Sequence, residues 1–184
     1  HLMTEKKLEQ IGKINLDLTY YPGEDFYCDG AIEDELLRIA RDYSVVEYPK
    51  IIEESRNWEI LYHLSKQREN IVEWLPITKD MKVLEVGSGC GAITGALAEK
   101  AGSVTCIDLS KKRSMINAYR HMENDNVTIH VGNFKDVEPS LDKDYDYICL
   151  IGVFEYGQAY IGGEKPFETF LNILKKHLKK DGHI

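Results

Sequence analysis

The feature that most constrains the fold is a glycine-rich turn placed between a short apolar run and a helix-forming segment. Residues 81–86 form the apolar run, and Gly87, Gly89 and Gly91 follow it directly. Glycine allows a tight turn and lets a ligand approach the backbone unhindered by a Cβ atom. The N-terminus of the following helix would offer free N–H groups and the positive end of its dipole. This order predicts a ligand site at the carboxyl end of a parallel strand.

Strands and helices alternate from residue 81 onward. Strands are expected at 81–86, 103–108, 127–131 and 146–151, and helices at about 90–102, 111–122 and 166–180. This alternation predicts an α/β fold with a doubly wound, mostly parallel sheet and helices on both faces. The sequence ends at Ile184, where a further strand is due. We therefore expect the C-terminal strands to be absent from this chain and the edge of the fourth strand to be exposed or covered by another segment.

Residues 4–64 differ in character, because they are rich in Tyr and Glu and show weak periodicity. Their clearest pattern is an amphipathic helix whose apolar face carries Ile32, Leu36 and Ile39. The turn at 20–23 is suited to fold over a pocket as a lid. We therefore expect an N-terminal helical or lid segment at 4–64 and the main α/β domain at 65–184.

Composition and charge narrow the class of protein. The formal net charge of −8 repels phosphate backbones, so nucleic-acid binding is not expected. No apolar run approaches the roughly 20 residues that span a bilayer, so no membrane span is expected. The four cysteines are far apart and form no Cys-x-x-Cys pair, which gives no support for a metal site. A reducing cytoplasm is the expected compartment.

Asp108 ends the second expected strand, where a carboxylate can accept hydrogen bonds from both hydroxyls of a ribose. Gly87, Gly89 and Ala92 also satisfy the looser dinucleotide fingerprint, and Asp108 would suit the ribose of NAD equally well. The glycines and the carboxylate thus predict an adenosine-type ligand, and they leave NAD open.

Four motifs in order resemble those of class I S-adenosylmethionine-dependent methyltransferases. The run 83–91, followed by Thr94, resembles motif I, and 105–110 resembles motif II. Residues 131–134 occupy the position after the third strand, and 146–156 resembles the motif after the fourth. The resemblance covers residues 64–182. It implies a Rossmann-like methyltransferase fold with S-adenosyl-L-methionine as the cofactor.

The resemblance also implies a set of cofactor-binding residues. Glu85 would orient the glycine turn and meet the cofactor's amino group, Asp108 would hold the ribose, and Leu109 would pack near the adenine. A bidentate arginine suits the cofactor carboxylate, although a solvated helix face also explains Arg68. Phe134 would border the adenine or pack in the core. The full set is Glu85, Gly87, Ser88, Gly89, Gly91, Asp108, Leu109, Asn133, Phe134 and Arg68.

Methyl transfer from such a cofactor mainly requires that a nucleophile be placed in line with the S–CH₃ bond. A hydroxyl acceptor would also need a general base. Glu155 and Tyr156 follow the fourth strand, and His63 precedes the helix that enters the first, so these three are the candidate catalytic residues. The family often has His where Tyr156 stands, which leaves the role of that position open. A surface or capping role also explains His63.

The acceptor is predicted to be a small molecule or a glycan precursor, methylated on oxygen or nitrogen. Several segments resemble methyltransferase domains of bacterial proteins that also carry glycosyltransferase modules, which implies further domains beyond Ile184; a homodimer is the alternative. Two other functions remain open from the residues. One is an NAD-dependent oxidoreductase using the same glycines, and the other is a non-catalytic methyltransferase-like binding module.

Overall fold

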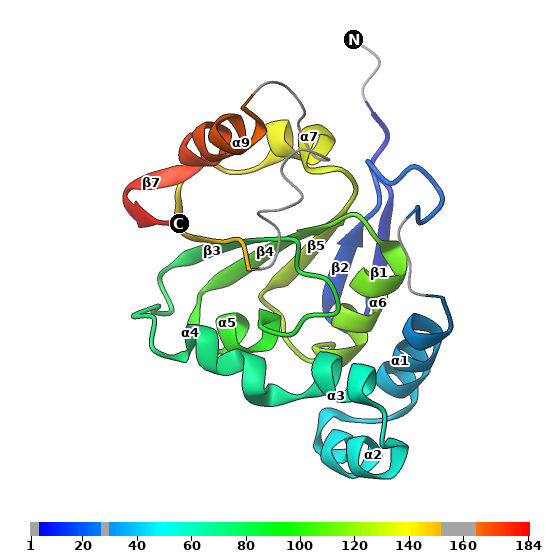
Figure 1. Cartoon of the computed structure of the whole chain (residues 1–184). Helices are drawn as coiled ribbons and strands as arrows, with labels where there is room; N and C mark the ends of the chain where they lie inside the picture. Colours follow the sequence, from blue (N-terminus) through cyan, green and yellow to red (C-terminus); the bar gives the residue numbers. More distant parts are fainter. Residues whose placement is uncertain (1–3, 27–29, 152–164) are drawn as a thin grey trace.

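A computed structural model describes residues 4–26, 30–151 and 165–184 and contains a seven-stranded sheet in the order β1-β2-β5-β4-β3-β6-β7 (Figure 1). All neighbouring strands are parallel except β1 and β2. The expectation of an α/β fold with a mostly parallel sheet is confirmed. The strands are β1 Leu8–Ile11, β2 Ile14–Asp17, β3 Lys82–Val86, β4 Ser103–Asp108, β5 Val127–Val131, β6 Tyr145–Cys149 and β7 Leu178–His183.

Helices lie on both faces of the sheet (Figure 1), and α1, α6 and α9 lie where helices were expected around 32–39, at 111–122 and from Pro166. The first expected helix after the glycine turn begins later than predicted, at Thr94 instead of Cys90. The α-helices are α1 Gly30–Asp42, α2 Tyr48–Ser55, α3 Trp58–Leu64, α4 Asn70–Glu73, α5 Thr94–Lys100, α6 Lys111–Arg120, α7 Phe134–Val137 and α9 Pro166–Lys175. Short 3₁₀ turns span Val45–Glu47, Lys66–Glu69 and Glu138–Ser140.

The core has one layer on each face of the sheet. Val83 and Leu84 are neighbours on β3 and both are fully buried, yet they belong to different clusters, because side chains alternate between the two faces of a strand. The Val83 cluster packs against α4, α5 and α6, whereas the Leu84 cluster packs against α7 and α9 (Figure 1). A third cluster joins α1, α2 and α3 to Cys90 and Ile116. The N-terminal helices are thereby packed next to the glycine-rich turn.

The N-terminal segment, expected to be a helical or lid segment, contains α1, α2 and α3 and also begins with a β-hairpin that joins the sheet. β1 and β2 pair antiparallel, and β2 pairs parallel with β5. Ile14 and Leu16 are fully buried and Asn15 is exposed, the alternation of a half-buried strand. Each strand has only four residues, which is too short for the alternation to be evident in the sequence. The sheet therefore draws strands from both expected segments of the chain.

The end of the chain also differs from the expectation. The helix expected at 166–180 ends at Lys175, and Leu178–His183 forms β7, parallel to β6. The C-terminal strands were predicted to be absent, and this prediction is wrong for β7, which covers the β6 edge. His177 explains the break, because its carbonyl accepts from the Tyr145 N–H (3.0 Å) and its ring lies 2.5 Å from Glu138 Oε1. These contacts hold the chain beside β6.

Among the described residues, the structure contains no helix with the length and apolar character that crossing a membrane requires.

Candidate functional site

The glycine-rich turn connects β3 to α5 at the carboxyl edge of the sheet. The backbone N–H groups of Gly87 and Ser88 donate to the carbonyl of Ile107 on β4, at 2.8 and 3.2 Å. Gly89 has a φ of +54°, and a Cβ atom built there would have no neighbour within 4 Å. Gly91 has a φ of +84°, and its Cβ would lie 2.1 Å from Asn117 Oδ1. The turn is thus closed against α6 at Gly91 and open at Gly89.

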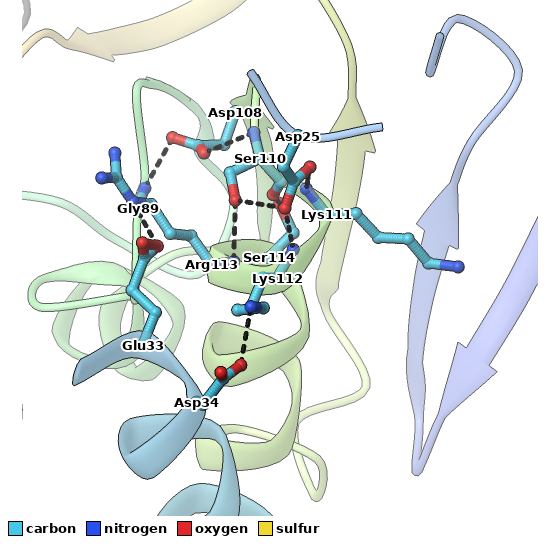
Figure 2. Close-up of polar contacts among 10 residues, drawn as sticks. All are labelled: Asp25, Glu33, Asp34, Gly89, Asp108, Ser110, Lys111, Lys112, Arg113 and Ser114. Atoms are coloured by element: carbon cyan, nitrogen blue, oxygen red, sulfur yellow. Dashed lines mark hydrogen bonds and ion pairs between the residues drawn. The ribbon is translucent and has the colours of Figure 1, made fainter. Parts of the chain in front are cut away.

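Asp108 ends β4 directly beside this turn, as Figure 2 shows. Its Oδ1 accepts from the Gly89 N–H at 2.9 Å, and its Oδ2 accepts from the Ser110 N–H at 3.0 Å. Only 8% of the residue is exposed. Burial raises the pKa of Asp108, and the two N–H donors and the nearby Arg113 guanidinium act against that rise. Each oxygen retains a lone pair for a ligand hydroxyl.

Glu85, near the end of β3, points into the protein beneath the turn. The residue is 3% exposed, and its Oε2 accepts a hydrogen bond from Thr94 Oγ1 at 2.7 Å. Cys106 Sγ lies 3.5 Å from the same oxygen, and burial raises the pKa of that thiol well above its usual range, so it is a neutral donor. Asn117 on α6 donates from Nδ2 to Thr94 Oγ1 at 3.1 Å. The carboxylate is therefore held by a buried polar cluster.

The loop after β5 meets the same edge. The Gly132 N–H donates to the carbonyl of Asp108 at 2.9 Å, which brings Asn133 beside the end of β4. Asn133 Oδ1 accepts from the Lys135 N–H and caps α7. The ring of Phe134 is fully buried, edge-on to Phe170 with centroids 5.1 Å apart. Core packing thus accounts for the Phe134 side chain, and only its backbone remains for a ligand.

Leu109 and Ser88 are the remaining expected cofactor-binding residues whose side chains the structure describes. Leu109 is partly buried against the Leu84 side of the core, and Ser88 is buried in the turn. Arg68 lies in the 3₁₀ turn before α4, and its side chain is outside what the structure describes. Glu155 and Tyr156 also lie outside the described residues. Their roles stay predictions.

His63 lies near the end of α3 and is joined to the turn through its backbone. Arg120 Nη1 donates to the carbonyl of His63 at 3.0 Å and to the carbonyl of Cys90 at 2.7 Å. The imidazole packs edge-on to the exposed Tyr62, with ring centroids 5.3 Å apart. The contact through Arg120 places α3 beside the glycine-rich turn, and the use of His63 as a base stays a prediction.

Asp25 also lies at this edge, although no motif in the sequence indicates a role for it. Its two oxygens accept from the N–H groups of Lys111 (2.8 Å) and Lys112 (3.0 Å), at the start of α6, and from Ser110 Oγ at 3.0 Å (Figure 2). Tyr21 donates to it through its hydroxyl at 2.9 Å. Burial acts to raise the pKa of Asp25, but these hydrogen bonds outweigh it and hold the pKa below the usual range. The contact joins residues more than eighty positions apart, so no local pattern signals it.

A second contact between the N-terminal segment and α6 lies close by. Arg113 Nε donates to Glu33 Oε1 on α1 at 2.8 Å, and Lys112 Nζ lies 2.6 Å from Asp34 Oδ1 (Figure 2). Glu33 is almost completely buried, whereas Asp34 is exposed at the surface. Charges from the N-terminal segment thus surround the start of α6 next to Asp108. Across the described residues, no group of three His, Cys, Asp or Glu side chains is placed to hold a metal ion.

The chain is similar in sequence to known methyltransferases. A family profile described as "Methyltransferase domain" matches residues 84–184. The uncharacterized methyltransferase YbaJ of Bacillus subtilis is 29% identical over 120 residues, which cover 62% of this chain and 46% of that protein. A probable cobalt-precorrin-6B C(15)-methyltransferase (decarboxylating) of Methanococcus maripaludis is 28% identical over 96 residues, 51% of this chain and 46% of that one. The chain spans about half the length of these curated relatives.

Among solved structures, phosphoethanolamine N-methyltransferase 1 of Haemonchus contortus, in complex with phosphoethanolamine and S-adenosylhomocysteine, superimposes with a TM-score of 0.54. The identity is 20%, and the match covers 79% of this chain and 31% of that one. At this identity the similarity supports the fold.

Proposed function

We propose that this chain, which belongs to the methyltransferase domain family, binds S-adenosylmethionine at the turn between β3 and α5 and takes part in methyl transfer. The observation that carries the proposal is the pairing of Asp108 with Gly89 at the carboxyl edge of the sheet, inside the segment that matches the family. This is the place where open α/β sheets bind nucleotide-like ligands.

The residues present fit that cofactor. Gly89 offers an open face at which a ligand can approach the backbone, and Asp108 retains acceptor capacity for two ribose hydroxyls. Glu85 supplies a buried carboxylate for the amino group of the methionine part. Asn133 and the backbone of Phe134 would border the adenine. The bound cofactor would supply an activated methyl group on a sulfonium, and the residues of this chain would orient it and exclude water.

We propose a small-molecule or glycan-precursor acceptor, methylated on oxygen or nitrogen. The net charge of −8 supports this class over a nucleic acid, because an acidic surface repels phosphate. Glu155, Tyr156 and His63 remain the proposed acid–base candidates. A cytoplasmic location is supported by the buried free thiols of Cys90, Cys106 and Cys149.

The cofactor is tested by calorimetric titration of the purified chain with S-adenosylhomocysteine and, separately, with NADH. We expect saturable binding of S-adenosylhomocysteine and a rise in melting temperature, because a ligand that binds only the folded state stabilises it. Stabilisation by NADH without any by S-adenosylhomocysteine would show that the site serves an oxidoreductase. Cofactor binding without turnover on a broad acceptor panel, in the full-length protein, would favour a non-catalytic module.

A further inference from the structure

A chain of hydrogen bonds runs from α6 to Glu85 beneath the glycine-rich turn, and it begins at His121. Nδ1 of His121 lies 2.8 Å from Asn117 Oδ1 and 3.0 Å from the Asn117 carbonyl. Both partners are acceptors, so Nδ1 carries a proton. Burial lowers the pKa of His121 to about 3, which keeps the ring neutral. The ring is therefore the Nδ1–H tautomer, and it donates to Asn117.

The position of that proton sets the direction of every later bond. Because Oδ1 of Asn117 accepts from His121, its Nδ2 faces Thr94 and donates to Oγ1 at 3.1 Å. The Thr94 hydroxyl accepts this bond and has one proton of its own, which it donates to Glu85 Oε2 at 2.7 Å. Each group in the chain thus fixes the orientation of the next, and the last group fixed is the Glu85 carboxylate.

Close packing leaves the side chains in this series of hydrogen bonds little freedom to rearrange. Thr94 and Asn117 are both completely buried. Gly91 and Gly95 lie directly against it, since a Cβ at Gly91 would be 2.1 Å from Asn117 Oδ1 and one at Gly95 would be 2.6 Å from His121 Nε2. The glycines of this segment therefore also allow α6 to approach closely enough for Asn117 to reach Thr94.

We propose that Asn117 and Thr94 are positioning residues that hold the Glu85 carboxylate in the orientation needed to bind the cofactor's amino group. The inference rests on the proposed function, because the orientation of Glu85 affects binding only if the cofactor occupies this site. A carboxylate already fixed by donors loses little freedom when the ligand binds, and such pre-organisation increases affinity. Asn117 lies more than thirty positions after Glu85 in the sequence, and the fold brings the two together through Thr94.

Asn117→Asp tests this series of hydrogen bonds, because aspartate has almost the same side-chain shape as asparagine. The variant keeps an acceptor for His121 and replaces the Nδ2 donor with an acceptor, so two carboxylates compete for the single proton of Thr94. We expect the affinity for S-adenosylhomocysteine, measured by calorimetry at pH 7.5, to fall by about tenfold or more. The free energy of unfolding is measured in urea on the same samples.

Asn126→Asp is the matched control. Nδ2 of Asn126 donates to the carbonyls of Ala98 (2.8 Å) and Ala101 (3.1 Å), so the control also removes internal donors. We expect it to lower stability and to leave the affinity for S-adenosylhomocysteine unchanged. A fall in affinity in both variants in proportion to lost stability would show that Asn117 has only a structural role and would overturn the proposal.

A second pair of variants decides the question if Asn117→Asp does not fold. Thr94→Val keeps the side-chain shape and removes the hydroxyl, whereas Thr94→Ser keeps the hydroxyl. We expect Thr94→Val to bind S-adenosylhomocysteine about tenfold more weakly and Thr94→Ser to bind like the unmodified chain. Unchanged affinity in Thr94→Val would overturn the inference while leaving the proposed function intact. Failure of the unmodified chain to bind S-adenosylhomocysteine would overturn both.

Discussion

Two opposing effects act on the pKa of the Asp108 carboxylate. Burial raises its pKa, and the N–H groups of Ser110 and Gly89 act in the other direction. The same two bonds tie the end of β4 to the turn after β3. Asp108 therefore shapes the site itself and also offers acceptors to a ligand.

Replacement of Asp108 by Ala should weaken cofactor binding at least tenfold, because hydrogen bonds to a charged acceptor contribute about 1.5–3 kcal/mol each. The loss is measured by titration calorimetry with S-adenosylhomocysteine. Asp136→Ala is the control, because Asp136 is exposed on α7. The affinity of this variant for S-adenosylhomocysteine should not change. Unchanged affinity in Asp108→Ala would mean that the ribose binds elsewhere.

Gly89 and Gly91 should respond differently to the same substitution. Both have positive φ, so alanine costs about 1–2 kcal/mol of backbone strain at either position. At Gly91 the new methyl would also meet Asn117 Oδ1, whereas at Gly89 it would enter open space. We expect Gly91→Ala to lower the free energy of unfolding more, and Gly89→Ala to stay folded but bind S-adenosylhomocysteine more weakly. Urea unfolding and calorimetry measure the two effects, and the reverse order would contradict the assigned open face.

Among the elements, α6 connects the site to the N-terminal segment. In its first turn, the Lys111 N–H donates to Asp25 of the loop after β2, and Arg113 pairs with the buried Glu33 of α1. At its last residue, Arg120 donates to the backbone carbonyl of His63 in α3. An acidic side chain at a helix N-terminus satisfies free N–H groups and interacts favourably with the dipole. The N-terminal helices are thus fixed to the same helix that supplies Asn117.

Asp25→Ala should lower the free energy of unfolding by about 2 kcal/mol, because the start of α6 and Ser110 lose a charged acceptor. Since the folded-state pKa of Asp25 lies below its ordinary value, this stabilisation is present above that ordinary value and is lost as the pH falls through the folded-state pKa. The difference between variant and unmodified chain, measured by urea unfolding at several pH values, should therefore shrink below about pH 4. Asp34→Ala removes an exposed ion pair and should cost less than about 1 kcal/mol. Equal losses in the two variants would contradict a capping role for Asp25.

The sequence predicted the elements that have a clear hydrophobic pattern and the parts of the site that consist of residues close together in the sequence. The strands expected at 103–108 and 127–131 appear with the same bounds, and Asp108 lies at the end of the first of them, beside the glycine-rich turn. It did not predict Asp25, because that contact depends on how distant segments pack. Phe134 shows a further limit, since a motif position does not reveal whether a ring faces the ligand or the core.

For the whole molecule, the alternation of strands and helices was sufficient to predict the α/β class, but the edges of the sheet were not predictable. The β1–β2 hairpin at one edge is short, and the first half of β7 at the other edge was expected to belong to the helix at 166–180. β7 has the character of an edge strand, because Lys179, Lys180 and Asp181 are exposed along it. Its neighbour β6 is mostly buried and contributes Tyr145 and Ile148 to the core. The charged strand β7 thus separates the largely buried strand β6 from solvent.

Removal of residues 178–184 should therefore lower both stability and solubility. The truncated chain would lose the packing of Leu178 and expose the hydrogen-bonding edge of β6 along with its apolar side chains. We expect a loss of at least about 3 kcal/mol in the free energy of unfolding, as for deletion of large core side chains, and self-association through the bare edge. Urea unfolding and size-exclusion chromatography measure these effects. A chain lacking only Ile184, which lies outside β7, is the control and should behave like the unmodified protein. A monomeric truncated chain of unchanged stability would show that β7 is dispensable and that the sheet is already complete at β6.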